Sequence, residues 1–322
     1  MSLGLRARRG VINGLRRLGP DSRTTHTAVR AVCKRRGVTC TFDDGRVSLV
    51  KGTREILLPR EHTLFAPYVA DNFDVFAASV VPQDRDGLQV ADFSGPGLHH
   101  YTSLGADFEM PAFPEAIAFD DEYFKYGAPN PGDLVFDLGA NIGLVAYALA
   151  GQVGPTGRVV SFEPDPGSLD YLRRNVSRHA LDQVTIEPLA IAPAAGRLEF
   201  YAEGTITSGL ASARKDSLMT QSMGSVITID AITLPDAVKR HGMPAWIKMD
   251  IEGAEIDVID GSRDLLASAY PHMVIDTSHW VGGDTTARRV EDLLRDIGYS
   301  VTTEEPGGSQ LTWAWREGQP AA

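Results

Sequence analysis

Four residues able to do acid, base or electrostatic chemistry fall within eight positions of one apolar segment. In WIKMDIEGAE, residues 246–255, these residues are Lys248, Asp250, Glu252 and Glu255. Carboxylates at the end of a strand can take up a proton or orient a hydroxyl, and a lysine can balance their charge. The alternative is a solvated strand end followed by a helix, whose dipole would favour Glu255 in the first turn.

A second candidate site begins where an apolar strand reaches Asp137. Gly139 and Gly143 follow and open a predicted helix. Glycine lets the backbone adopt positive φ or pass close to a ligand, and a helix N-terminus offers free N–H groups. The next strand ends in Glu163, placed to accept hydrogen bonds from both hydroxyls of a ribose. Two acids at equivalent strand ends predict a nucleotide-type site, whereas the alternative is that both only cap helices.

The spacing of the glycines narrows the ligand. Dinucleotide sites usually show G-x-G-x-x-G, because the diphosphate needs close backbone approach. Here the pattern is D-x-G-x-x-x-G, from Asp137 to Gly143. A carboxylate would repel a pyrophosphate but suits the ammonium group of an amino acid. The spacing therefore favours S-adenosylmethionine, which has an amino acid end, a sulfonium and no phosphate.

The organisation of the chain predicts an α/β fold. From about residue 126, strand-like runs alternate with helix-like runs, which indicates βαβ units and a mostly parallel, doubly wound sheet. Two closing runs, GYSVTTE and SQLTWAW, predict a terminal hairpin. We predict a basic N-terminal lead (1–40), a smaller N-terminal α+β region that caps the site or binds substrate (41–125), and an S-adenosylmethionine-binding domain (126–318).

Charge and composition exclude several classes of protein. The net charge is −11, yet residues 1–40 hold ten Lys and Arg and one Asp, so the rest is strongly acidic. An acidic body argues against nucleic-acid binding, which depends on neutralising phosphates. The basic lead is either a solvated helix or a weak contact with an anionic membrane surface. Two cysteines, Cys33 and Cys40, are too few for a disulfide framework, and with no signal peptide or membrane span a cytoplasmic protein is expected.

The motifs together resemble the FkbM family of S-adenosylmethionine-dependent methyltransferases. The matching segments are VFDLGANIGL, VVSFEPDP, LAI, ITID and above all IKMDIEGAE, within residues 126–315. The resemblance implies a class I, Rossmann-like fold with a seven-stranded sheet, helices on both faces and an antiparallel last strand. It also implies O-methylation of sugars, glycolipids or polyketide-type natural products. At Asp276, in VIDTSH, members often carry Glu.

The chemistry of O-methylation suggests roles for the first cluster. Transfer from a sulfonium needs mainly positioning, while an alcohol acceptor gains from a general base. Asp250, Glu252 and His279 are the candidate bases, and Lys248 balances the acids or orients a carboxylate. A divalent metal on Asp250, Glu252 and His279 is an alternative that the sequence alone does not favour.

The predicted donor site combines the motifs with the strand that carries Asp250. We expect S-adenosylmethionine to contact Asp137, Gly139, Ala140, Asn141, Gly143, Glu163, Pro164, Ala190 and Asp250. The expected partner is a small-molecule hydroxyl acceptor. The sequence does not give the oligomeric state. The alternatives are an NAD-dependent oxidoreductase on a similar fold and a binding module without catalysis.

Overall fold

The chain forms two compact units, Met1–Ile117 and Ala118–Ala322. Residues 209–210 are described by their backbone alone. The predicted membrane contact of the basic lead rests largely on residues 1–17, which lie outside the described residues. The computed structural model describes residues 18–43, 45–115, 123–202, 209–210, 225–305 and 309–318.

The N-terminal unit combines short helices with a five-stranded sheet of order β1-β2-β3-β5-β4, and β6 and β7 form a hairpin. Ser22 caps the first described helix by accepting a hydrogen bond from the Thr25 backbone N–H, and the helix buries Val29 and Cys33. The elements are α2 (Arg23–Arg35), β1 (Thr39–Asp43), β2 (Arg46–Lys51), β3 (Arg54–Pro59), η1 (Arg60–Phe65), α3 (Ala66–Asp71), α4 (Phe73–Ser79), β4 (Gln83–Arg85), β5 (Leu88–Asp92), β6 (Gly97–Tyr101) and β7 (Ala106–Met110).

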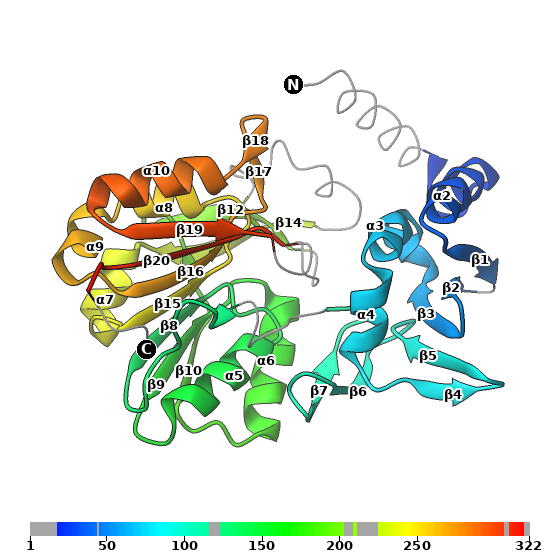
Figure 1. Cartoon of the computed structure of the whole chain (residues 1–322), viewed down its shortest axis with the longest axis horizontal. Coiled ribbons are helices and arrows are strands. Elements are labelled where there is room, and N and C mark those ends of the chain that lie inside the picture. The colour runs from blue at the N-terminus through cyan, green and yellow to red at the C-terminus, as the bar shows by residue number, and fades with distance from the viewer. Residues whose placement is uncertain are drawn as a thin grey trace. The chain divides into compact units, whose positions relative to one another are not determined.

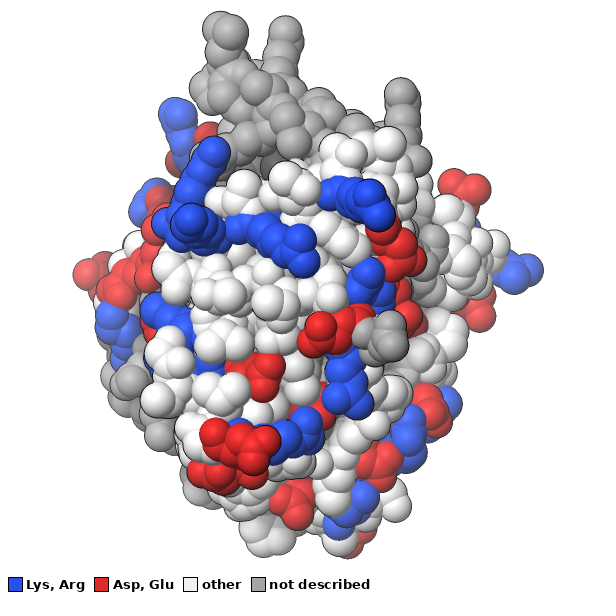
Figure 2. Space-filling view, turned by 90° about the vertical axis from the view of Figure 1, so that its right-hand side faces the viewer, with Lys and Arg blue, Asp and Glu red and all other residues white. Residues whose placement is uncertain are grey.

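Charged side chains of both signs occur together on the surface. On the face shown in Figure 2, Lys and Arg side chains are interspersed with Asp and Glu among uncharged residues. Such mixing is typical of a solvated surface. Among the described residues, no helix is both long and apolar enough to cross a membrane.

The C-terminal unit alternates strands and helices, as the periodicity predicts. Its elements are β8 (Leu134–Leu138), α5 (Leu144–Val153), β9 (Arg158–Phe162), α6 (Pro166–Arg178), β10 (Val184–Glu187), β11 (Ala190–Ile191), β12 (Gly196–Ala202), β13 (Gly209–Leu210), β14 (Ser225–Ile232), α7 (Leu234–His241), β15 (Trp246–Met249), α8 (Glu255–Asp260), α9 (Arg263–Ala269), β16 (His272–Asp276), β17 (Trp280–Val281), β18 (Asp284–Thr285), α10 (Ala287–Ile297), β19 (Ser300–Glu304) and β20 (Leu311–Trp315).

A seven-stranded mixed sheet of order β10-β9-β8-β15-β16-β20-β19 forms the centre of this unit. The strands β10, β9, β8, β15 and β16 run parallel, and β20 pairs antiparallel with both β16 and β19. The expected α/β class is confirmed. Chain order reverses between β8 and β15, and doubly wound sheets bind ligands at the carboxyl ends of the strands at such a point.

Helices lie on both sides of this sheet, with α8, α9 and α10 on one side and α5 and α6 on the other (Figure 1). Phe136 and Leu138 of β8 share one core with Ile247 and Met249 of β15 and with apolar residues of α7, α8, α9 and α10. Because side chains alternate along a strand, the residues between these apolar ones point to the opposite face. The alternation therefore places Asp137 and Lys248 together.

A second, four-stranded sheet of order β11-β14-β12-β13 is inserted between β10 and β15. Phe200, Ile229 and Ala231 of this sheet join the same hydrophobic core. The insertion thus shares the hydrophobic core of this unit.

Candidate active site

A row of three polar side chains crosses the centre of the sheet. Asp137 lies opposite Ser161 on β9 and opposite Lys248 on β15. Ser161 Oγ lies 3.4 Å from Asp137 Oδ2, to which it donates, and Lys248 Nζ lies 3.5 Å from Asp137 Oδ1. Burial raises the pKa of Asp137, while the charge of Lys248 opposes that rise. Because Asp137 is fully buried and Lys248 is 3% exposed, the opposite charge of each offsets part of the cost of burying the other.

The glycine turn after β8 is held against both neighbouring strands. The N–H groups of Gly139 and Ala140 both donate to the Phe162 carbonyl, and Lys248 Nζ donates to the Gly139 carbonyl. Gly139 has φ of +78°, and a Cβ there would lie 1.9 Å from the Asp250 carbonyl oxygen. Gly143 precedes α5 with φ of +93°, and a Cβ would meet Leu172 at 2.7 Å. The close approach of the Asp250 carbonyl therefore requires glycine at position 139, and the positive φ favours glycine at both positions.

Glu163 lies beside this turn at the end of β9. Its Oε2 accepts a hydrogen bond from the Asn141 N–H and its Oε1 from the Asp165 N–H, both at 2.8 Å. Burial raises the pKa of Glu163 to about 8, although the two backbone donors oppose the rise. Asn141, which has φ of +48°, and Ala140 belong to the same turn, and half-buried Pro164 follows Glu163.

The loop between β15 and α8 carries two more acids. The Asp250 N–H donates to the Leu138 carbonyl and so continues the pairing with β8. Asp250 is 31% exposed and its Oδ2 lies 3.9 Å from Lys248 Nζ, while Glu252 is 20% exposed. Glu255, fully buried, accepts hydrogen bonds from the N–H groups of Ile251 and Gly253 on Oε1. A buried carboxylate therefore fixes the loop that presents Asp250 and Glu252.

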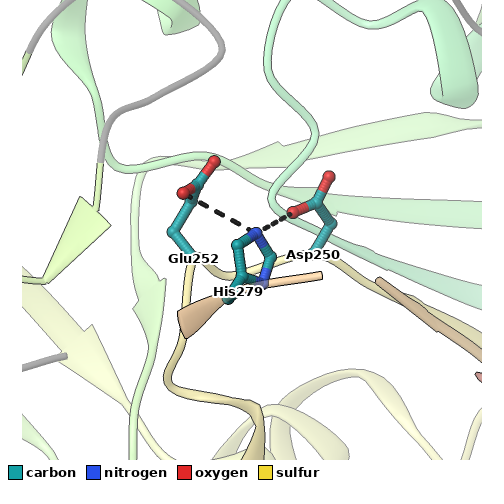
Figure 3. Close-up of side chains that lie close together, drawn as sticks. All are labelled: Asp250, Glu252 and His279. Carbon is teal, nitrogen blue, oxygen red and sulfur yellow. Dashed lines mark ion pairs between the residues drawn. The ribbon is translucent and has the colours of Figure 1, made fainter. Parts of the chain in front are cut away.

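His279 faces all three of these carboxylates. Its Nε2 lies 3.5 Å from Asp250 Oδ1 and 3.6 Å from Glu252 Oε2 (Figure 3). Its Nδ1 lies 3.0 Å from Glu255 Oε1. Burial would lower the pKa of His279, but the carboxylates, with Glu255 contributing most, raise it well above its usual value. Burial would likewise raise the pKa of Glu255, but the charge of His279 and the backbone donors lower it.

His279 and Ala190, two of the candidate site residues, lie outside the strands of the central sheet. β16 ends at Asp276, and His279 lies in the loop that follows. Ala190 is in β11, in a different sheet from the strands that lead to Asp137, Glu163 and Asp250. Asp276 accepts hydrogen bonds from the Ser278 N–H and Oγ, and burial raises its pKa.

Ser161 and Glu255 have larger roles in the site than their sequence positions indicated. Glu255 was weighed as a helix-start carboxylate, but it bonds the Asp250 loop and lies against His279. Ser161 lies between apolar residues of β9. A polar residue at such a buried position is a signal from which its role could have been predicted.

The topology and the position of the site define a class I methyltransferase fold. The model of the methyltransferase FkbM domain matches residues 137–301, which include every acid described above. The chain belongs to the FkbM methyltransferase family and is a methyltransferase of that type.

Two relatives and one solved structure show how far the similarity extends. The 31-O-demethyl-FK506 methyltransferase FkbM of Streptomyces tacrolimicus is 31% identical over 219 residues, covering 59% of this chain and 81% of that protein. The 2-O-methyltransferase NoeI of Sinorhizobium fredii (strain NBRC 101917 / NGR234) is 27% identical over 178 residues, covering 51% and 72%. A crystal structure of the methyltransferase FkbM from Methylobacillus flagellatus KT aligns with a TM-score of 0.45 at 15% identity, covering 92% and 60%.

Proposed function

We propose that this methyltransferase transfers the methyl group of S-adenosylmethionine to a hydroxyl of a small molecule. The sugar, glycolipid and polyketide-type acceptors expected from the sequence remain the proposed substrate class. Two relatives support the choice of oxygen, because their names describe a 31-O-demethyl substrate and a 2-O-methyltransferase. The acidic cluster supports it as well, since an alcohol needs a group to take its proton.

One observation supports S-adenosylmethionine as the methyl donor. Glu163, 5% exposed, is held by two backbone N–H groups next to the glycine turn. A carboxylate fixed in this way at the end of the second strand suits the two hydroxyls of a ribose. The turn lacks the G-x-G-x-x-G spacing of a diphosphate site. These residues therefore fit S-adenosylmethionine better than a dinucleotide.

The buried pair is proposed to position the donor site. Asp137 is fully buried and lies beside Lys248, so we propose that it acts through this lysine. Lys248 in turn donates to the Gly139 carbonyl of the glycine turn. The turn of Gly139, Ala140, Asn141 and Gly143, whose own N–H groups bond within the protein, then sets the position of the α5 N-terminus beside the donor.

Asp250 is the proposed general base. Bound S-adenosylmethionine supplies a methyl group on a positively charged sulfur. The acceptor oxygen forms a bond to the methyl carbon as the carbon–sulfur bond breaks, the sulfur keeps the electron pair, and the hydroxyl proton passes to Asp250. Asp250 is the most exposed of the three carboxylates around His279. His279, whose pKa the surrounding carboxylates raise, lies against these acids and serves to hold them in place.

Methyl transfer to matched acceptors tests this proposal. We would incubate the full chain with S-adenosylmethionine carrying a labelled methyl group and with pairs of acceptors, each hydroxyl compound beside its deoxy analogue. The proposal predicts label in the hydroxyl members only and release of S-adenosylhomocysteine. Label in carbon or nitrogen positions would contradict O-methylation. Reduction of NAD⁺ by the same alcohols without methyl transfer would favour the oxidoreductase, and donor binding without turnover on any acceptor would favour the binding module.

The raised pKa of Glu163 predicts that donor binding depends on pH. An ionised carboxylate accepts hydrogen bonds from a ribose better than the protonated form does. With a pKa of about 8, roughly one-eleventh of the apo protein has Glu163 ionised at pH 7 and about ten-elevenths at pH 9. Affinity for a ribose-containing ligand should therefore rise about tenfold across this range. Calorimetry at several pH values measures it.

The probe for this titration is 5′-methylthioadenosine, which keeps the ribose but lacks the titrating α-amino group of the donor. Glu163→Gln provides the matched control, because an amide of the same shape does not titrate. Its affinity should be weak and flat between pH 7 and 9. An equal rise in both proteins would show that another group causes the pH dependence.

A further inference from the structure

We propose that Asp250, Glu252 and His279 bind a divalent cation of the Mn²⁺ type and that the cation holds the acceptor. These residues offer two carboxylate oxygens and an imidazole nitrogen, and the three atoms all lie within 4.8 Å of one another. They come from the loops that follow the adjacent parallel strands β15 and β16. Binding of the cation is independent of the methyl donor, whereas its use on an acceptor rests on the function proposed above.

The spacing of the ligand atoms fits a shared ion better than direct hydrogen bonds. His279 Nε2 is almost equally distant from two carboxylate oxygens: 3.5 Å from Asp250 Oδ1 and 3.6 Å from Glu252 Oε2. A charge-assisted hydrogen bond would be about 2.7–2.9 Å. Adjacent ligands of an octahedral ion with bonds of about 2.1–2.3 Å lie about 3.0–3.3 Å apart. Moving His279 Nε2 a few tenths of an ångström closer to each of these two oxygens would therefore give the spacing of adjacent ligands.

A buried carboxylate orients the imidazole for this role. Glu255 is fully buried, and its Oε1 lies 3.0 Å from His279 Nδ1. Histidines that bind metals usually donate their other ring N–H to a carboxylate or carbonyl, which fixes the tautomer and raises the basicity of the ligating nitrogen. The same oxygen of Glu255 accepts the Ile251 and Gly253 N–H groups and so holds the loop that carries the two acidic ligands. A single residue thus organises all three candidate ligands.

The charge of the cluster also favours a cation. Three carboxylates, Asp250, Glu252 and Glu255, surround His279 within 3.6 Å, and Lys248 lies nearer to Asp137 than to Asp250. The three carboxylates would attract a divalent ion, and their charges would favour its binding.

The ligand types select the ion. Carboxylate oxygens suit Mg²⁺, Ca²⁺ and Mn²⁺, whereas imidazole suits later transition metals. A site with two carboxylates and one imidazole favours Mn²⁺ over Mg²⁺ or Ca²⁺. Three protein ligands leave three positions of an octahedral ion, enough for water and for two neighbouring acceptor oxygens. This predicts an acceptor with adjacent oxygen functions, such as a vicinal diol.

Manganese binding by the full chain tests the proposal without donor or acceptor. Chelator-treated, desalted protein is titrated with Mn²⁺, and the paramagnetic resonance signal of free Mn²⁺ is followed. One site with a Kd in the micromolar range is expected. Glu252→Gln and His279→Gln should each weaken it by at least about tenfold. Glu199→Gln, a change of the same kind on β12, should leave it unaltered, and circular dichroism checks that each variant is folded.

Folded wild-type protein that leaves the free Mn²⁺ signal undiminished would overturn the proposal, because His279 would then be held by the carboxylates alone. Equal Mn²⁺ affinity in the wild type and both site variants would place the ion elsewhere and overturn it too. Since these readouts use no methyl donor, manganese binding without methyl transfer would contradict the proposed function while leaving the metal site intact.

Discussion

Asp250→Asn is expected to lower kcat for methyl transfer by about 10²–10⁴-fold, the usual contribution of a positioned base. Asparagine keeps the shape of the side chain but cannot take the hydroxyl proton. Asp250 is 31% exposed at the carboxyl end of β15, where an acceptor can reach it. The Kd for S-adenosylmethionine should change by no more than about threefold, because the lost interaction acts mainly in the transition state. Steady-state kinetics and calorimetry measure the two effects.

Asp230→Asn is the matched control for this experiment. Asp230 lies on β14 with an exposed side chain, and its ion-pair partner Arg197 is 4.0 Å away. The same chemical change there should leave kcat unaltered. If Asp250→Asn instead weakens donor binding as strongly as it lowers kcat, Asp250 belongs to the donor pocket and another group accepts the proton.

Lys248→Met is expected to lower the free energy of unfolding by about 3–5 kcal/mol, because it leaves Asp137 buried without its partner. Lys248 Nζ lies 3.5 Å from Asp137 Oδ1, and the two side chains are 3% and 0% exposed. Urea denaturation monitored by circular dichroism gives this quantity.

The double variant Asp137→Asn, Lys248→Met separates the pair from its individual charges. Removing both charges should restore at least about half of the lost stability, since neutral groups can replace a buried ion pair at little cost. A double variant no more stable than Lys248→Met would contradict the pairing. If its stability recovers while the donor Kd stays raised, the charged pair is needed for donor binding as well as for stability.

The central strands and their acids were predictable because their signals are local. An apolar run ending in Asp137, a glycine turn and a second run ending in Glu163 each occupy a few consecutive residues. The observed β8 and β9 end one residue beyond Asp137 and one residue before Glu163. The positive φ of Gly139 and Gly143 follows from the same short pattern. The contacts made at these two glycines could not be predicted from that pattern, because the neighbouring residues, Asp250 and Leu172, lie far along the chain.

The arrangement around His279 depends on contacts that no short pattern encodes. That Glu255 turns inward from the start of α8 is set by how this helix packs on the sheet. His279 reaches it only because the loop after β16 returns past the end of β15, its neighbour in the sheet. The alignment of Lys248 with Asp137 likewise depends on strand register, and a slip of one residue would send Lys248 to the other face. The sequence was enough to predict that these residues are important, but not which of them contact one another.

The most direct test of the central claim is a calorimetric titration of the chelator-treated full chain with S-adenosylmethionine, S-adenosylhomocysteine and NAD⁺. The site built from Glu163 and the glycine turn predicts micromolar binding of the first two ligands and no heat from the third. Binding of NAD⁺ with no measurable binding of the other two ligands would contradict the claim and assign the turn after β8 to a dinucleotide.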